Sequence, residues 1–518
     1  MLLFNGSVLL KNERLKLYKK PSTWILMGII LLLVALTVII SYLSQYGMRA
    51  YQNKWQDEYL WQLSDAKSMA EIDPDDANIK KMIDTLGYLL ENDINPYDWR
   101  TDAVNDYFSL KHNVIEPDYD DMKIHYEMIK PDINGFIIGQ QTETEKPVET
   151  EIDQAELKSR MEKLWTVITK NDWKSYIRYK IDDLKIDYNQ AVYKDELDVD
   201  IEIYELYLEK NIVPISQNSY FNYGFEQPES EWKGTQIQLI RDSKMNLLQG
   251  EDQGGIMYTR AQLKSFENDI KIAQERLSTN TPPIAYNSFL GMLEQAASSL
   301  SLITVLMVVY SANLFASEYG SGTIKMLLIT PHKRKKIFWA KSRLLLELAL
   351  ISMGIVFIIS FIFNGLFTGF KGIGAMQILY VFGNIIRLPY LLYIIVCYLI
   401  LMLPVIAYGA LALMLSVVTR KSAVSIAVTL LLLFTSDLLI MLMTLPVGGA
   451  VLPGTKFLIF ANTSLQYYLP SAQVAYGEMF YRTVDETMTL GFSVAILLIY
   501  IICFIWTARD SFCRRDVK

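Results

Sequence analysis

The sequence predicts an all-α polytopic membrane protein, with six transmembrane helices and a large, mainly helical extracytoplasmic domain between the first and the second. Six apolar segments approach or exceed the roughly 20 residues that a helix needs to cross a bilayer. Residues 51–285 hold 46 of the 56 acidic residues but only 26 of the 49 basic ones, a net charge of −20, whereas the rest of the chain has a net charge of +13. An acidic polar block inside a basic, apolar frame excludes a single soluble globule. With 51% hydrophobic residues, disorder is excluded as well.

Residues 1–20 predict an amphipathic helix on the cytoplasmic membrane surface, because leucines lie among lysines there. A merely solvated basic tail is the alternative. The first span is predicted at 21–46. Its apolar core is longer than that of a secretory signal peptide, and no small-residue cleavage site follows it, so we expect a retained anchor.

Residues 47–285 form the acidic block, which is long enough for a core of its own. Apolar residues at spacings of three and four predict helices over most of it, and a short strand is possible at 221–225. The acidic runs at 73–76 and 116–121 are candidates for calcium binding, but neither matches an EF-hand loop, so a solvated acidic surface is favoured and no metal site is expected. All three cysteines lie outside the block, which therefore has no disulfide framework.

The other five spans are predicted at 286–316, 344–366, 390–418, 423–445 and 489–507. An extracytoplasmic loop, 367–389, joins the third span to the fourth, in which Pro404 predicts a kink. Only helices and closed barrels satisfy the backbone in lipid, and these unbroken runs lack the alternation of barrel strands.

Lysine and arginine mark the cytoplasmic ends of membrane helices. They cluster before the first span, at 317–343, between the fourth and fifth spans, and in the tail 508–518. With six spans, all four clusters fall on one side of the membrane and the acidic block falls on the other. We therefore expect a multi-pass plasma membrane protein with both termini in the cytoplasm.

No motif for catalysis is present. The string nearest to a Walker A loop, residues 449–456, has threonine and lysine in the wrong order and falls on the predicted extracytoplasmic side. The sequence has neither an HExxH arrangement nor a serine or cysteine nucleophile in a recognisable turn. We expect no enzyme activity and no cofactor in this chain; if the protein does energised work, the motor is another polypeptide.

The most informative segment is the basic stretch at 317–343. Glycines interrupt the helix that leaves the second span, an apolar pair follows, and a proline precedes a basic run. The residues that define this order are Glu318, Gly322, Thr323, Lys325, Leu327, Leu328, Pro331, Arg334 and Lys341. Any cytoplasmic loop can be basic, but this order of residue types is more particular.

The segment resembles the cytoplasmic loop of type-2 ABC exporter permeases, and the six spans, the basic first helix and the short basic tail extend the resemblance. In that family the loop contains a coupling helix that docks into a separate ATPase subunit. The resemblance implies a bacterial permease without its own ATPase domain. It would be paired with a second copy or a related permease and with two ATPase subunits that hold ATP and Mg²⁺. It covers the membrane frame, not the acidic block.

Residues 446–488 mix apolar side chains with glycines and prolines on the predicted extracytoplasmic side. Non-helical backbone at membrane depth is tolerated only where protein or a cavity covers it. The resemblance implies re-entrant helices here, at the outer mouth of a transport pathway. A plain external loop is the alternative.

Asp437 is the one acidic residue well inside a predicted span. A charge at mid-bilayer costs several kcal/mol unless it is paired or hydrated, so Asp437 is a candidate for the transport pathway. A hydrogen bond between packed helices is the alternative. Glu294 and Glu347 lie near span ends, where they could reach the interface.

An ABC permease is the favoured function, and its partners would be ATPase subunits, another permease and the lipid bilayer, but no nucleic acid. A membrane-anchored receptor or sensor with a ligand-binding ectodomain is the alternative, although the cytoplasmic stretches are too short for a signalling domain. An intramembrane enzyme would need paired catalytic groups, and Asp437 stands alone. Nothing in the sequence identifies the cargo.

Overall fold

The protein is described from a computed structural model. The described residues are 8–19, 21–52, 55–112, 154–187, 194–216, 231–252, 257–258, 260–285, 287–324, 333–381, 383–444, 454–468 and 488–514. These residues are mainly helical and divide into two compact units. One comprises residues 1–46 and 250–518, and the other comprises 47–249. The sequence placed the end of the acidic block at 285, whereas the helix α12 (Arg260–Thr279) belongs to the first unit, because it packs against the strand β1 (Met376–Val381).

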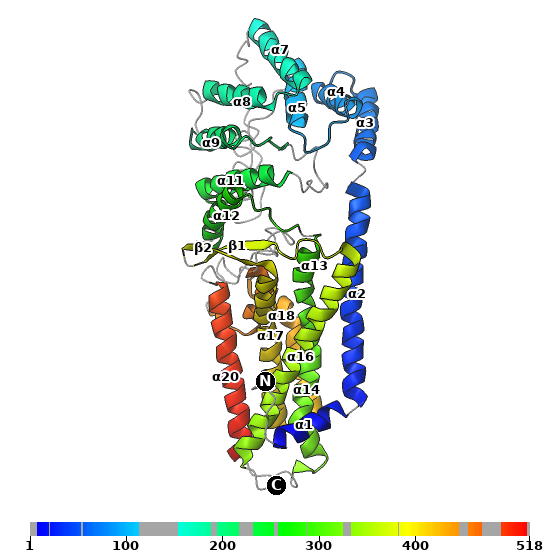
Figure 1. Ribbon diagram of the computed structural model, residues 1–518, viewed down its shortest axis with the longest axis vertical. Helices are drawn as coiled ribbons and strands as arrows, with labels where there is room; N and C mark the ends of the chain where they lie inside the picture. Colours follow the sequence, from blue (N-terminus) through cyan, green and yellow to red (C-terminus); the bar gives the residue numbers. More distant parts are fainter. Residues whose placement is uncertain are drawn as a thin grey trace, which may run out of the picture. The chain divides into compact units, whose positions relative to one another are not determined.

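The first unit is a bundle of long helices that lie alongside one another (Figure 1). They are α2 (Pro21–Gln52), α14 (Leu300–Gly320), α16 (Arg334–Thr368), α17 (Tyr390–Thr419), α18 (Ser422–Thr444) and α20 (Leu490–Arg514). The short helices α13 (Phe289–Gln295) and η2 (Ala296–Ser299) lead into α14. The helix α1 (Val8–Tyr18) lies at one end of the bundle, and β1 lies at the other (Figure 1).

Within the described residues, five segments are long and apolar enough to cross a membrane. They correspond to the predicted spans one, two, three, four and six. The helix α18 covers the predicted fifth span, but its apolar stretch, Ser422–Ser436, is shorter than the others. A polytopic, mainly helical membrane protein is thus supported, while the exact count of six spans stays a prediction.

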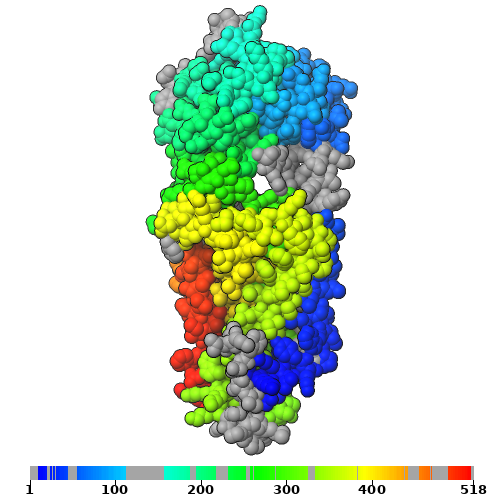
Figure 2. Space-filling model, viewed as in Figure 1, coloured from blue at the N-terminus to red at the C-terminus, as the bar shows by residue number. Residues whose placement is uncertain are grey.

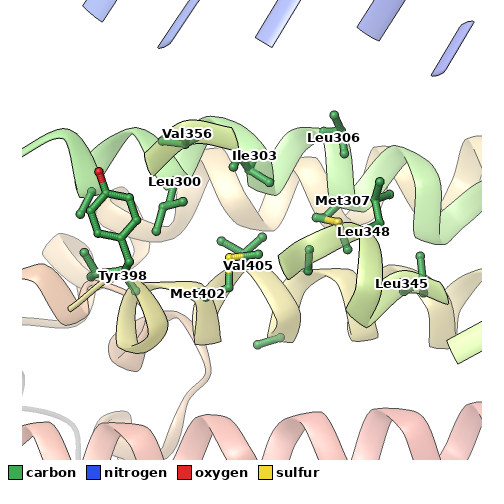
Figure 3. Packing of buried hydrophobic residues seen from close by; sticks show 14 of the residues in the cluster. Leu300, Ile303, Leu306, Met307, Leu345, Leu348, Val356, Tyr398, Met402 and Val405 are labelled. Carbon is green, nitrogen blue, oxygen red and sulfur yellow. The ribbon is translucent and has the colours of Figure 1, made fainter. Parts of the chain in front are cut away.

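The main core lies between α14, α16 and α17, and its buried side chains include Leu300, Leu348 and Met402 (Figure 3). The helices α14 and α17 come close because Gly409 faces α14: a Cβ at this position would lie 3.3 Å from the hydroxyl of Ser311. Small residues allow such close approach, which favours helix association in membranes. Pro404 lies inside α17, as the sequence predicted.

A β-hairpin occupies the predicted loop 367–389. The antiparallel strands β1 and β2 (Asn384–Pro389) pair in the register Met376 with Pro389 and Val381 with Asn384. Gly383, at a φ of +84°, supplies the backbone conformation that a tight turn needs. The sequence predicted only a loop here and missed the hairpin, because its strand signal was hidden in a short apolar stretch between two spans. The described residues are otherwise mainly helical, as the sequence predicted.

The described residues of the second unit form seven further helices. They are α3 (Trp55–Ile72), α4 (Ala77–Glu91), α5 (Trp99–Lys111), α7 (Gln154–Lys170), α8 (Trp173–Asp187), α9 (Lys194–Lys210) and α11 (Trp232–Gln249). It has its own core, which includes Tyr59, Leu86 and Trp99. In the acidic run 73–76, Asp76 caps α4 by accepting hydrogen bonds from the backbone N–H groups of Asn78 and Ile79. The run 116–121 and the possible strand at 221–225 lie outside the described residues.

The described part of the segment 446–488 consists of the short turns η3 (Thr455–Phe457), η4 (Phe460–Asn462) and η5 (Leu465–Tyr468). These turns contact α17, α18 and α20, and Leu465 is fully buried in the main core. The segment therefore packs into the bundle over these residues. Whether it re-enters the membrane stays a prediction.

Candidate functional site

The predicted coupling residues lie at the end of the bundle that also holds α1. Glu318 is in the last turn of α14, Arg334 is the first residue of α16, and Lys341 lies two turns further along α16. Gly322 has a φ of +73°, which lets the chain turn away after α14 ends. Thr323 accompanies this turn, with its hydroxyl 2.8 Å from that of Ser321. The other four predicted residues, Lys325, Leu327, Leu328 and Pro331, lie outside the described residues.

A buried ion cluster joins both flanks of this segment to α1. The ammonium group of Lys341 lies 2.8 Å from Glu13 Oε2 and 2.9 Å from Glu318 Oε1, and it also donates a hydrogen bond to the backbone oxygen of Leu314, at 3.2 Å. The Lys341 side chain is only 2% exposed, and those of Glu13 and Glu318 are 6% and 11% exposed. One buried lysine thus links α1, α14 and α16.

Lys16 completes the cluster from the solvent side. Its ammonium group lies 3.0 Å from Glu13 and 3.3 Å from Glu318, and its side chain is half exposed. Two carboxylates and two ammonium groups therefore meet in one place, with no net charge. Such compensation is what allows charged groups to be buried at all.

The environment of Glu13 favours its charged form. Burial by itself raises the pKa of this carboxyl, but the attraction of the Lys341 ammonium and the hydrogen bonds from Lys341 and Lys16 outweigh burial. The pKa of Glu13 therefore lies below its usual value. Burial lowers the pKa of Lys16, but the hydrogen bonds and attraction to Glu13 and Glu318 together outweigh burial, so the pKa of that lysine is raised.

A second ion pair also holds α1 against α16. The guanidinium of Arg14 donates two hydrogen bonds to Glu347, at 2.9 and 2.7 Å, and Arg343 lies 3.3 Å from the same carboxylate. A bidentate arginine–carboxylate pair fixes orientation as well as distance. Leu10 is also buried in α1, so this helix is anchored by apolar and charged contacts together. Figure 2 shows the surface of α1, in dark blue, beside that of α16.

Aromatic rings support the cluster from inside the bundle. Phe315 of α14 packs against Phe338 of α16 and Phe512 of α20, with ring centroids 5.7 and 5.0 Å apart. The Lys341 ammonium lies 5.4 Å from the Phe315 ring centroid, within cation–π range. A change in the position of α1, or of either end of the segment 317–343, would therefore shift the packing of α14, α16 and α20.

Comparison with known proteins identifies the family. Residues 7–517 match the model of a family described as "ABC-2 family transporter protein". The chain is a member of the ABC-2 transporter family. Because the match spans nearly the whole chain, it includes the acidic unit that the resemblance seen in the sequence left out. Members of this family are membrane subunits without an ATPase domain of their own.

Two relatives of this ABC-2 protein come from Bacillus subtilis (strain 168). The chain is 30% identical over 234 residues to the "Uncharacterized membrane protein YdbK". The matched region covers 45% of this chain and 84% of the relative. It is 26% identical over 254 residues to the "Uncharacterized protein YhcI". The matched region covers 49% of this chain and 76% of the relative. No solved structure matches the chain.

Asp437, the predicted pathway residue of this ABC-2 protein, lies in α18. Its side chain is outside the described part of the structure, so its role stays a prediction. Within the described residues, no group of three or more histidine, cysteine, aspartate or glutamate side chains could hold a metal ion.

The structure brings forward two acids to which the sequence gave little weight. Glu347 binds Arg14, as described above, and Glu294 of α13 is only 4% exposed. One carboxylate oxygen of Glu294 accepts a hydrogen bond from the Tyr390 hydroxyl, and the other, Oε1, is buried with no hydrogen-bond partner. Position near a span end suggested that Glu294 could reach the membrane interface. The packing of α13 against α16 and α17 buries it instead, and no local sequence signal indicates that packing.

Proposed function

We propose that this chain is the permease subunit of an ABC exporter whose ATP hydrolysis takes place in separate ATPase subunits. The family match supports a permease and implies an ATP-binding partner in general. The sequence supports the separation of the two activities, because it has no Walker A loop. ATP and Mg²⁺ would be held by the partner.

The proposed topology has six spans, with both termini in the cytoplasm of the plasma membrane and the acidic block outside. Support comes from the four basic clusters, which fall on one side only if α18 also crosses the membrane. The ion cluster and the basic run that starts at Lys333 would then both face the cytoplasm, whereas the hairpin would lie outside.

The proposed coupling surface is the segment 317–343, whose described ends contribute Glu318 and Lys341 to the ion cluster. Leu327 and Leu328 would be the apolar anchors of a short helix that docks into the ATPase, and Lys325 and Arg334 would set its register by charge. The observation on which this rests is the burial of Lys341 between Glu13 and Glu318. Because these contacts lie within the chain, we assign Glu318 and Lys341 a positioning role: they hold both ends of the segment and α1 as one body.

The proposed assembly is two permeases with two ATPase subunits, in which the second permease is either another copy or a relative. Asp437 is proposed to line the transport pathway. In such an assembly the segment 317–343 must be connected rigidly to the bundle, because a docked helix can move the bundle only if its two ends keep their positions relative to it.

The test is co-purification. An affinity-tagged chain, expressed with a Walker-motif ATPase encoded beside its gene, should retain that ATPase through purification and show ATP hydrolysis. Hydrolysis should disappear when the Walker lysine of the ATPase is replaced, while the complex remains. A chain that purifies alone, with no ATPase bound under the same conditions, would contradict the proposed function.

A further inference from the structure

The end of the bundle opposite the ion cluster contains a second set of buried charges, around the hairpin. Arg276 of α12 is 6% exposed and Glu294 of α13 is 4% exposed. Within the described residues, neither side chain forms a direct ion pair. Burying a charged group without a counter-ion costs free energy. The hydrogen bonds from uncharged groups to Arg276 and Glu294 therefore stabilise the packing at this end of the bundle.

Tyr390 and Gln377 are those partners. Gln377, on β1, accepts a hydrogen bond from Arg276 Nη2 at 3.1 Å, and the backbone oxygen of Pro282 accepts one from Nη1 at 3.1 Å. Tyr390, the first residue of α17, donates its hydroxyl to Glu294. Burial lowers the pKa of Arg276, and the nearby Tyr390 partly offsets this effect. Tyr390 therefore binds Glu294 directly and interacts electrostatically with Arg276.

The hairpin connects these contacts to one another. The backbone N–H of Tyr390 donates to the oxygen of Ala375, at 2.9 Å, just before β1 begins. On the exposed side, Lys271 donates to the hydroxyl of Tyr380 at 3.0 Å, and Glu275 pairs with Arg387 of β2. Three side-chain contacts thus bind α12 to the hairpin, and the hairpin runs directly into α17.

We propose that Arg276, Gln377, Tyr390 and Glu294 form a latch that holds α12 and the hairpin to the outer ends of α13 and α17. The latch must release before water can enter the bundle at this end. The helix α12 follows the acidic unit in the chain, and α17 contacts α14, α18 and α20, so the latch gives the extracytoplasmic region a mechanical route to the centre of the bundle. It is defined by contacts within this chain and does not depend on the ATPase partner.

Cys397 is a natural reporter of release. It lies on α17 about 10 Å along the helix from Tyr390, at 1.5 Å per residue. It is 1% exposed, and a thiol shielded from water is unreactive toward maleimides. With Cys503→Ser and Cys513→Ser, it remains the only cysteine of the chain. The rate of its reaction with a small maleimide in the full-length protein then measures opening.

The test compares Tyr390→Phe, Arg276→Gln and the double variant. Each single change should raise the labelling rate of Cys397 at least about fivefold, and the double variant should exceed the larger single effect by less than about twofold, because contacts of one latch are not additive. The matched control is Tyr398→Phe, which removes an uncharged hydrogen bond from α17 to the backbone oxygen of Leu293 in α13 and should change labelling less than about twofold.

The outcomes separate the latch from general loosening. Unchanged labelling in Tyr390→Phe, which preserves the ring and its packing, would overturn the proposal. Equal increases in Tyr390→Phe and Tyr398→Phe, or single effects that multiply in the double variant, would also overturn it, because they would indicate independent local damage. Thermal unfolding of each variant checks that the bundle is intact, so that labelling reports opening.

Discussion

At the scale of single residues, Lys341 is the most consequential side chain at the proposed coupling surface. It is nearly inaccessible and touches two carboxylates from different helices. Removing one partner of a buried ion pair leaves an uncompensated charge, whereas losing an exposed ion pair costs little. Lys341 and Lys16 contact the same two carboxylates but differ in exposure, so they form a natural comparison.

We expect Lys341→Met to destabilise the bundle by roughly 3–5 kcal/mol, because Glu13 and Glu318 would lose their buried cation. Lys16→Met should cost no more than about 1 kcal/mol, because Lys16 is half exposed. Thermal or denaturant unfolding in detergent measures both. Adding Glu13→Gln and Glu318→Gln to Lys341→Met should recover much of the loss. If both lysine variants unfold alike, the buried cluster does not position the segment.

At the scale of elements, the structure assigns α1 a more specific place than a helix lying on the membrane surface. Arg14 binds Glu347 with two hydrogen bonds, and both side chains are largely buried. The helix is therefore attached to α16 by orientation-dependent contacts. This attachment is testable apart from the buried cluster.

We expect Arg14→Glu to expose α1 to trypsin in inside-out vesicles, because two carboxylates would then face each other. Charge-assisted hydrogen bonds of this kind contribute about 1.5–3 kcal/mol. Combining Arg14→Glu with Glu347→Arg should restore most of the protection. The control is Arg514→Glu, which breaks the exposed pair with Asp510 on α20 and should leave cleavage of α1 unchanged. Full protection in Arg14→Glu alone would mean that this pair does not hold α1.

The sequence was most informative where one physical constraint dominates. Membrane spans can be recognised by the length and composition of their apolar segments. The helix α1 and five of the six predicted spans lie where the sequence predicted them. The hairpin was missed because its strands lie in an apolar stretch, where the alternation of apolar and polar residues typical of a strand is weak. Gly383-Asn384 is nevertheless a turn signal. Glu294 and the internal pairing of Glu318 with Lys341 could not be predicted, because each depends on contacts between helices far apart in the chain.

At the scale of the whole molecule, the charge asymmetry determines the expected orientation. Residues 51–285 have a net charge of −20, and the rest of the chain has one of +13. Lysine and arginine near the ends of spans favour the cytoplasmic side, so the four basic clusters of the apolar frame predict one orientation. The same orientation puts the ion cluster inside the cell and the latch outside.

Cysteine labelling in intact cells tests the orientation. With the natural cysteines replaced, Ser68→Cys in α3 should react with a membrane-impermeant maleimide, because its position is exposed and predicted to be extracytoplasmic. Lys335→Cys in α16, which is also at an exposed position, should react only after the membrane is permeabilised. Equal labelling of both positions in intact cells would refute the topology.

We expect energy to enter this permease through the segment 317–343, and the affinity between the purified permease and its ATPase tests this most directly. Apolar anchors dominate interface energies. We therefore predict that Leu327→Asp with Leu328→Asp raises the dissociation constant at least about tenfold, which corresponds to about 1.4 kcal/mol. Lys335→Ala or Lys336→Ala should change it much less, because exposed charges contribute little. If the double aspartate variant binds its ATPase as tightly as the unmodified permease does, the segment is an ordinary basic connector and the account of coupling is contradicted.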